Sequence, residues 1–170
     1  MKIRVAEPTD LDRIVEIYNQ AVPGRISTGD TEPLDPETQR DWFRGYLPAR
    51  NPIFVAEAPG GSVAGYNALS LYRGGRPAFR HTLETSYYVH ERHRRQGVAS
   101  ALMQHVFTHG PELGIKTLVA YVMEHNRASI ALLERFGFRR WGLLPRAADF
   151  AGREYDHTLY GKRVGEFGLY

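Results

Sequence analysis

The sequence predicts one α+β domain, an α/β sandwich in which helices pack on a mixed sheet. Its elements follow the order strand, helix, helix, three strands, helix, strand, helix, strand, strand, and elements mixed in this order form layered sheet-and-helix folds. The strand–helix–strand step over 81–122 requires a parallel pair with a right-handed crossover. With 170 residues, 42% of them hydrophobic, the chain has the size of one domain. We expect that domain to span 1–163, followed by a tail at 164–170.

Two helices are predicted near the N-terminus, separated by a loop at 23–34. The first lies within 8–22, starts after a cap at Thr9 or Asp10, and repeats apolar residues at helical spacing. The second is capped by Asp35 and has a proline in its first position. We expect its aromatic side chains to face the core. These aromatic residues are Trp42, Phe43 and Tyr46.

The remaining elements follow from alternation, apolar runs and turn residues. The runs 52–58 and 62–73 are joined by a short glycine-rich connection, which favours an antiparallel hairpin. Helices are expected at 97–109 and at about 126–136, the second capped by Asn126 and ended by Gly137. The other predicted strands are 3–6, 81–89, the apolar run 115–122, and two closing strands in 138–144 and 155–163 around a loop at 145–153.

Composition excludes several classes of function. The chain has no cysteine, so a thiol nucleophile, a disulfide framework and thiolate metal sites are excluded. Neither a long apolar run nor a secretory segment is visible, so we expect a cytoplasmic protein without membrane contact. His105 and His109 are four residues apart but have no third ligand nearby, and we expect no metal site. The net charge of +3 is concentrated at 92–95, which indicates a local anion site and no nucleic-acid partner.

Glu84 is unusual because it lies among strand-forming residues, where glutamate is disfavoured. Side chains alternate along a strand, so Glu84, Ser86 and Tyr88 share one face of the strand 81–89. Two interpretations remain open from spacing alone. The carboxylate either lies on a solvated face or works in a cleft.

The stretch "HRRQGVAS" directly follows this strand and opens a helix. A helix N-terminus presents unpaired N–H groups and a positive dipole end. Small residues there let a phosphate approach the backbone, and Arg94 and Arg95 add positive charge. The pattern is neither a Walker A nor a dinucleotide-binding motif. It is consistent with a pyrophosphate site or with a solvated basic loop, whose charge would include His90 and His93.

Together these motifs resemble the GNAT superfamily of N-acetyltransferases. "RRQGVA" is similar to the acetyl-CoA loop of that superfamily, [Q/R]-x-x-G-x-[G/A], and "NRASIALLERFGF" to its second signature. "FRHTLETSYYVHERHRRQG" and "IYNQAV" look like the branch that acetylates phosphinothricin and methionine sulfoximine. The resemblance extends from about residue 2 to residue 163.

This resemblance implies a GNAT fold: a mixed, mostly antiparallel sheet that splays open at the acetyl-CoA site, with helices on both faces. Glu84 matches the proposed general base of the branch, and the resemblance places Arg80 near the acceptor. Arg80 could equally be a surface arginine where the strand begins, and Tyr72, in the preceding loop, could line the same cleft. Acetyl-CoA is the implied cosubstrate. The residues implied to bind it are Tyr87, Tyr88, Val89, Arg94, Arg95, Gln96, Gly97, Val98, Ala99, Ser100 and Asn126.

The sequence departs from the family at the group that protonates the leaving thiolate. Many relatives carry Tyr or His four residues before the glycine of "GF", and this chain has Leu133 there. Tyr88, Tyr121 or water could serve, or the thiolate could leave unassisted. The leading hypothesis is acetylation of a small amino acid or analogue. A polyamine, a drug, a protein N-terminus, or a non-catalytic binding module are the alternatives, and the branch implies a homodimer.

Overall fold

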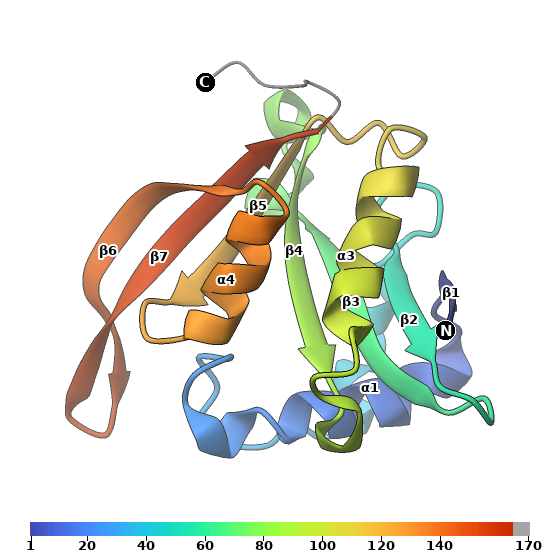
Figure 1. The fold of residues 1–170 in the computed structure, drawn as a ribbon, viewed down its shortest axis with the longest axis horizontal. Coiled ribbons are helices and arrows are strands. Elements are labelled where there is room, and N and C mark those ends of the chain that lie inside the picture. The colour runs from blue at the N-terminus through green and yellow to red at the C-terminus, as the bar shows by residue number, and fades with distance from the viewer. Residues whose placement is uncertain (165–170) are drawn as a thin grey trace.

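The computed structural model describes residues 1–164. Within them, seven strands form one sheet in the order β1-β2-β3-β4-β5-β7-β6 (Figure 1). Neighbouring strands are antiparallel except β4 and β5, which are parallel. The predicted parallel pair and hairpin are therefore confirmed. The strands are β1 (Lys2–Val5), β2 (Ile53–Glu57), β3 (Val63–Leu71), β4 (Thr82–Val89), β5 (Thr117–Met123), β6 (Arg139–Phe150) and β7 (Arg153–Arg163).

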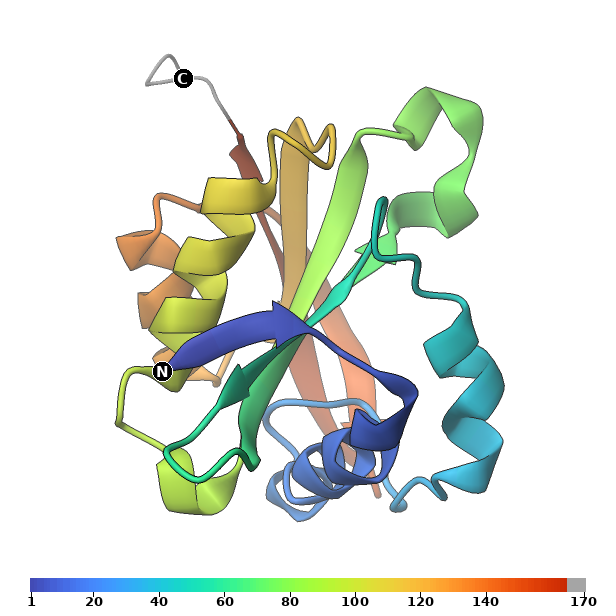
Figure 2. The ribbon, with the colours of Figure 1, turned by 90° about the vertical axis from the view of Figure 1, so that its right-hand side faces the viewer.

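Helices cover both faces of the sheet. The helices are α1 (Leu11–Asn19), α2 (Arg40–Arg44), α3 (Val98–His109) and α4 (Arg127–Arg135). Figure 2 shows α3 and α4 on one side of the sheet and α1 and α2 on the other. The larger core lies on the side of α3 and α4 and includes Leu83, Leu102 and Leu133, whereas the smaller one includes Ile14 and Tyr66. None of the helices in residues 1–164 is long and apolar enough to cross a membrane.

The predicted boundaries of α4 are confirmed by its hydrogen bonds. Asn126 Oδ1 accepts from Ser129 N–H at 3.1 Å, which caps the first turn. At the other end Gly137 adopts φ +80°. The N–H groups of Gly137 and Phe138 donate to Glu134 O and Leu133 O at 2.9 and 3.0 Å, the pair of bonds that defines a Schellman motif. The chain thus enters β6 immediately after α4.

Two local expectations were wrong. Residues 145–153 are mostly strand, because β6 and β7 continue to a tight turn at 151–152, where Ala151 and Gly152 have positive φ. The second helix is a 3-10 turn plus a single α-turn, and Trp42 is 37% exposed. Such a short helix cannot direct all its aromatics inward. α1 starts after Asp10, one of the two expected cap positions, but the Asp10 side chain accepts from Glu7 N–H at 2.8 Å and from no N–H of α1.

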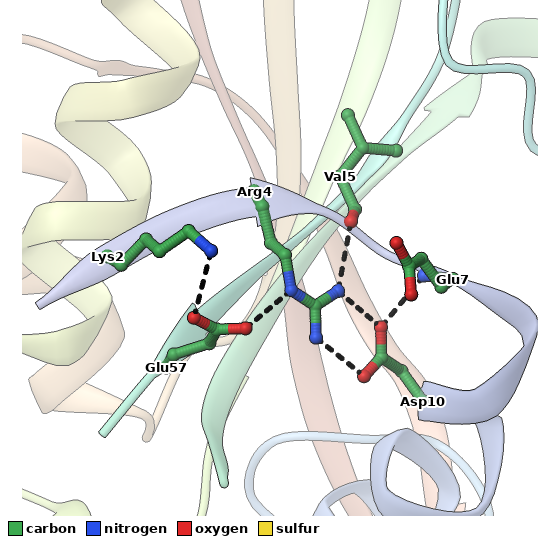
Figure 3. Close-up of polar contacts among 6 residues, drawn as sticks. All are labelled: Lys2, Arg4, Val5, Glu7, Asp10 and Glu57. Atoms are coloured by element: carbon green, nitrogen blue, oxygen red, sulfur yellow. Dashed lines mark hydrogen bonds and ion pairs between the residues drawn. The ribbon is translucent and has the colours of Figure 1, made fainter. Parts of the chain in front are cut away.

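The N-terminal strand is held by a charged cluster (Figure 3). Arg4 donates to both carboxylate oxygens of Asp10, at 2.7 and 2.9 Å, and to Glu57 at 2.6 Å. Asp10 is only 7% exposed. Burial alone would raise the pKa of Asp10, but the hydrogen bonds from Arg4 and from Glu7 N–H hold it below its ordinary value. Arg4 therefore joins β1 to β2 and to the start of α1.

The end of the chain extends slightly beyond the expected domain boundary. Val164 N–H donates to Lys116 O at 2.9 Å, and the Val164 side chain packs against the larger core. The rest of the predicted tail, 165–170, lies outside the described residues.

Candidate active site

The site is built around the place where β4 and β5 separate. The two strands pair only at Thr82, Leu83 and Glu84 of β4. Beyond Glu84 they diverge, as Figure 1 shows, and a cavity of about 250 Å³ lies between them. Its walls are formed by Glu84–Tyr88 of β4, Ala120–Met123 of β5, and residues of the loop after α1.

The edge of β4 that faces this gap carries unpaired main-chain groups. His90 N–H donates to Ala64 O of the neighbouring segment at 2.9 Å. Residues along an antiparallel pair alternate in the direction of their main-chain groups. The main chain of Ser86 and Tyr88 therefore bonds to β3. Thr85 directly follows the last position paired with β5, so the free edge that faces the gap is the main chain of Tyr87 and Val89. An extended ligand arm can pair with this edge as an additional strand would.

Glu84 lies at the apex of the gap, at the last paired position of β4. Its side chain is half-buried and lines the cavity. Burial raises the pKa of Glu84 above its ordinary value. The structure thus favours the cleft over the solvated face for this carboxylate. A carboxylate with a raised pKa is a stronger base, and such shifts are enriched at functional sites.

The loop between β4 and α3 presents a helix N-terminus to solvent. Gly97 precedes α3 with φ +82°, and Ala101 N–H donates to Gly97 O at 2.9 Å. By helix geometry the N–H groups of Val98, Ala99 and Ser100 have no acceptor within the helix. A Cβ placed on Gly97 would meet nothing within 4 Å, so the space beside Gly97 is open. This arrangement fits a pyrophosphate.

Asn126 joins both sides of the gap. Its Oδ1 caps α4, and its Nδ2 donates to Ile26 O and Ser27 Oγ, each at 3.3 Å. From the other side of the gap, Tyr88 hydroxyl donates to Ser27 O at 3.0 Å. The segment 25–29 therefore closes the wide end of the gap between β4 and the start of α4. Sequence reasoning treated this segment only as a loop.

A second cavity, of about 340 Å³, lies on the face of the sheet that Glu84 shares with Tyr88. Tyr18, Ser86 and Tyr88 line both this cavity and the one in the gap, so the two are adjacent. Its wall is largely aromatic and aliphatic with a few polar groups. The other lining residues are Ile14, Val15, Asp30, Leu34, Gln39, Trp42, Tyr46, Tyr66, Ala68 and Ser70.

Tyr18 and Asp30 are site residues that sequence reasoning missed. Tyr18 hydroxyl contacts both Thr28 Oγ1 and Asp30 Oδ2, and its ring meets Tyr88 edge to face at 4.9 Å. Chiefly by burial, the pKa of Tyr18 is raised to about 12. Tyr18 follows the apolar stripe of the helix, which predicted core packing. Only the polar run "STGD" at 27–30 hinted at its partners.

Two sequence-predicted residues do not line these cavities, although Tyr72 interacts with Tyr121 of the gap cavity. Arg80 is exposed and donates to Pro77 O at 3.0 Å. Tyr72 stacks edge to face on Phe79. Neither residue is among those lining the two cavities. Their role at the acceptor site stays a prediction. Leu133 is completely buried in the larger core, so it supplies no polar group to the gap.

A parallel pair that separates beside a helix N-terminus is an arrangement that fits an acyl-CoA-dependent acyltransferase. A profile described as "Acetyltransferase (GNAT) family" matches residues 11–138. The chain therefore belongs to the GNAT family and is an acetyl-CoA-dependent N-acetyltransferase.

Relatives within the family narrow the branch. The Bacillus subtilis protein YwnH is 40% identical over 96% of this chain and 99% of its own. The L-methionine sulfoximine/L-methionine sulfone acetyltransferase of Pseudomonas aeruginosa PAO1 is 34% identical over 92% of this chain and 91% of its own. The crystal structure of a phosphinothricin acetyltransferase from Sinorhizobium meliloti in complex with acetyl-CoA has a TM-score of 0.89 and 28% identity, covering 96% of this chain and 88% of that one.

Proposed function

We propose that this enzyme acetylates the amine of a small amino acid or amino-acid analogue, with Glu84 as general base. The observation that carries the proposal is the position of Glu84 at the apex of the gap, where it lines the gap cavity on the same face of β4 as Ser86 and Tyr88, which line both cavities. Relatives that include an L-methionine sulfoximine/L-methionine sulfone acetyltransferase and a phosphinothricin N-acetyltransferase support this acceptor class.

Acetyl-CoA supplies the acetyl group as a thioester. We propose that the N–H groups of Val98, Ala99 and Ser100 hold its pyrophosphate, with Arg94 and Arg95 adding charge and Gln96 and Gly97 completing the loop. The gap-facing main chain of Tyr87 and Val89 would pair with the pantetheine arm, beside Tyr88 and Asn126. A main-chain N–H on that edge would also donate to the oxygen that gains negative charge during acyl transfer.

Glu84 would remove the proton that an amine carries at neutral pH. An ammonium group has no lone pair for attack, so a base must take a proton directly or through one water. The raised pKa of Glu84 brings its basicity closer to that of the amine. Because the carboxylate is half-buried, water competes less strongly for it.

The second cavity is the proposed place of the acceptor side chain. Its aromatic and aliphatic wall favours an apolar or sulfur-containing side chain, and Ser70, Ser86 and Asp30 provide a few hydrogen-bonding groups. Asp30 supplies the one carboxylate among the residues that line it. A polycationic acceptor is therefore poorly matched.

Leaving-group protonation would not use Leu133. Tyr121 lines the gap, whereas Tyr88 hydroxyl already donates to Ser27 O. Burial raises the pKa of both tyrosines, so each hydroxyl stays protonated at neutral pH. Since a thiolate is a stable leaving group, we propose that Tyr121 or a water molecule is sufficient.

An acceptor screen tests the proposal. Thiol release from acetyl-CoA is measured with methionine sulfoximine, methionine sulfone, phosphinothricin, common amino acids, a polyamine and a peptide. We expect turnover with the amino acids or analogues. Glu84→Gln should lower kcat about 10²- to 10⁴-fold, whereas Glu112→Gln, an exposed residue remote from the site, should leave it unchanged. Turnover confined to the polyamine or peptide would refute the acceptor class.

We also propose that the enzyme is a cytoplasmic homodimer, as the branch implies. The β6 edge strand exposes Trp141, Leu143 and Leu144, at 49%, 39% and 44%, and an exposed apolar group of this kind is consistent with an interface. Sedimentation equilibrium of the native chain tests the oligomeric state. A monomer at micromolar concentration would contradict it.

A further inference from the structure

His90 is buried beneath the loop that precedes α3. Its residue exposure is 3%, and its N–H donates to Ala64 O at 2.9 Å. Sequence reasoning counted this histidine as part of the positive charge of the loop. Its burial contradicts that interpretation, since a side chain so enclosed cannot meet a ligand at the surface. Its ring must act on the loop itself.

The hydrogen bonds of the ring identify its protonation state. Arg92 N–H donates to His90 Nδ1 at 3.2 Å. A main-chain N–H can only donate, so Nδ1 carries a lone pair and the ring is neutral, with its proton on Nε2. That nitrogen lies 3.4 Å from Glu16 Oε1 of α1. His90 thus accepts from the loop on one side and faces a carboxylate on the other.

Glu16 is itself held in place. Arg13 donates to Glu16 Oε2 at 2.6 Å and to Val63 O at 3.1 Å. The hydrogen bond from Arg13 is the main reason that the pKa of Glu16 is lowered, so the carboxylate stays ionised at neutral pH. A second link from α1 runs from Gln20 Oε1, which accepts from Glu91 N–H at 2.9 Å.

The loop needs such support because its backbone is unusual. Arg95 adopts φ +61° and Gly97 φ +82°, and a non-glycine residue seldom adopts the left-handed conformation. Within the loop, Gln96 Nε2 donates to Arg92 O at 2.9 Å. Arg92 is therefore bound by its N–H to His90 and by its carbonyl to Gln96, and it connects the buried ring to the turn before α3.

We propose that His90 is a positioning residue for acetyl-CoA: its neutral ring, oriented by Glu16, holds residues 91–97 in the shape that presents the N-terminus of α3. A carboxylate that selects the tautomer of a histidine is a general device for orienting an imidazole. The inference rests on the proposed pyrophosphate site. It predicts that His90 acts on acetyl-CoA affinity and not on the chemical step.

Three substitutions of His90 test the contributions of its two ring nitrogens separately. Asn at position 90 keeps an acceptor near Nδ1, Gln keeps one only near Nε2, and Phe keeps neither. We expect His90→Gln and His90→Phe to raise the KM for acetyl-CoA about tenfold, which equals one hydrogen bond of about 1.4 kcal/mol. His90→Asn should remain within about threefold of the native enzyme. In all three, kcat and the KM for the acceptor should stay nearly unchanged.

A purely structural role would give a different pattern. It would lower the melting temperature and the active fraction, hence kcat, while the KM for acetyl-CoA stayed constant. That result, or equal KM values for Asn and Gln at position 90, would overturn the proposal. If His90→Phe does not fold, the Asn and Gln variants decide. His109→Asn, at the far end of α3, is the matched histidine control and should change neither KM.

Direct binding of coenzyme A tests the pyrophosphate site and the role of His90 separately. Titration calorimetry with Gly97→Ala tests the pyrophosphate site, because alanine is strained at φ +82°. Unchanged affinity in Gly97→Ala would remove that site and the inference with it. Weaker binding in Gly97→Ala, but native affinity in His90→Gln, would remove only the inference about His90.

Discussion

At the scale of single residues, the site depends on where each polar group is buried. Glu84 alternates onto a sheet face and becomes half-buried where its strand leaves the parallel pair. Tyr18 and His90 are drawn inward by the same packing that forms the core, yet both keep a polar atom directed at a partner. Burial raises the pKa of Glu84 and of Tyr18, and both changes can be measured.

Glu84 should make both activity and stability depend on pH. Its pKa in the fold is raised by burial, so ionising it costs stability as the pH rises through that pKa. Glu84→Gln should therefore raise the melting temperature at neutral pH, and the gain should vanish below the unfolded pKa of the carboxyl, near 4.5. Calorimetry across pH checks the sign. A lower melting temperature of the variant at neutral pH would contradict the burial argument.

The activity profile gives a second measure of the same group. If Glu84 is the base, kcat/KM should fall on the acid side with an apparent pKa above 4.5, the ordinary value for glutamate. The matched measurement uses Glu84→Gln at high enzyme concentration, where this acid limb should disappear. An unchanged limb would assign the titration to another group.

At the scale of secondary-structure elements, short segments are held by a few side chains. β1 has only four residues, and Arg4 links it to β2 and to the start of α1. Asn126, which caps α4, also donates to Ile26 and Ser27 of the loop at the wide end of the gap. In both places one side chain makes hydrogen bonds to two parts of the fold. Its removal should therefore weaken both of them.

Arg4→Met should destabilise the domain by about 3 kcal/mol at neutral pH, because it leaves the buried Asp10 carboxylate without its partner. The pKa of Asp10 is lowered in the fold. Its contribution is therefore present above its unfolded value of 3.8 and is lost as the pH falls through the lower, folded pKa. Urea unfolding at neutral pH and near pH 2 measures the loss of stability and its dependence on pH. Arg40→Met, which breaks an exposed pair with Glu37, should cause no measurable loss.

Asn126 allows its two roles to be separated. Asn126→Ala removes the cap of α4 and the donors to Ile26 and Ser27, and should cost about 1 kcal/mol for the cap alone. Asn126→Asp keeps the cap and removes only the donors. We expect it to retain more stability in urea than the alanine variant, while both raise the KM for substrates. Equal stability of the two variants would show that the cap contributes little.

At the scale of the whole molecule, the gap divides the sheet into β1–β4 and β5–β7. Only three residues of β4 pair with β5, and segment 25–29 contacts both sides at the wide end. A ligand that fills the gap contacts both halves. Its binding should therefore stabilise the domain as a unit.

Coenzyme A at 100 times its Kd should raise the free energy of unfolding by about 2.7 kcal/mol. The amide protons of Tyr87 and Val89 should also exchange more slowly, because they face the gap and become paired. Hydrogen-exchange mass spectrometry measures the protection of β4 and of the α3 N-terminus in the same experiment. Protection of the α3 N-terminus without protection of β4 would contradict the pairing of the pantetheine arm.

Much of this fold could be predicted from the sequence because its signals are local. Apolar spacing predicted α1, Gly97 and Asn126 predicted the starts of α3 and α4, and the strand–helix–strand step predicted the parallel pair. The same local motifs indicated the family. The wrong predictions also had local causes. The β6–β7 hairpin has polar strand residues that resemble a loop. The helical signal of α2 is short, and the predicted helix was too long.

What the sequence determined by itself is therefore the order of elements, the boundaries of α4 and the family; its assignment of residues 94–100 to acetyl-CoA stays a prediction. Only the tertiary structure decided that Glu84 faces a cavity, that Tyr18 meets Asp30 and Tyr88, and that His90 faces Glu16. Periodicity and capping depend on neighbours a few residues away. The contact between His90 and Glu16 joins residues 74 positions apart, and it exists only because the sheet places the end of β4 beside α1.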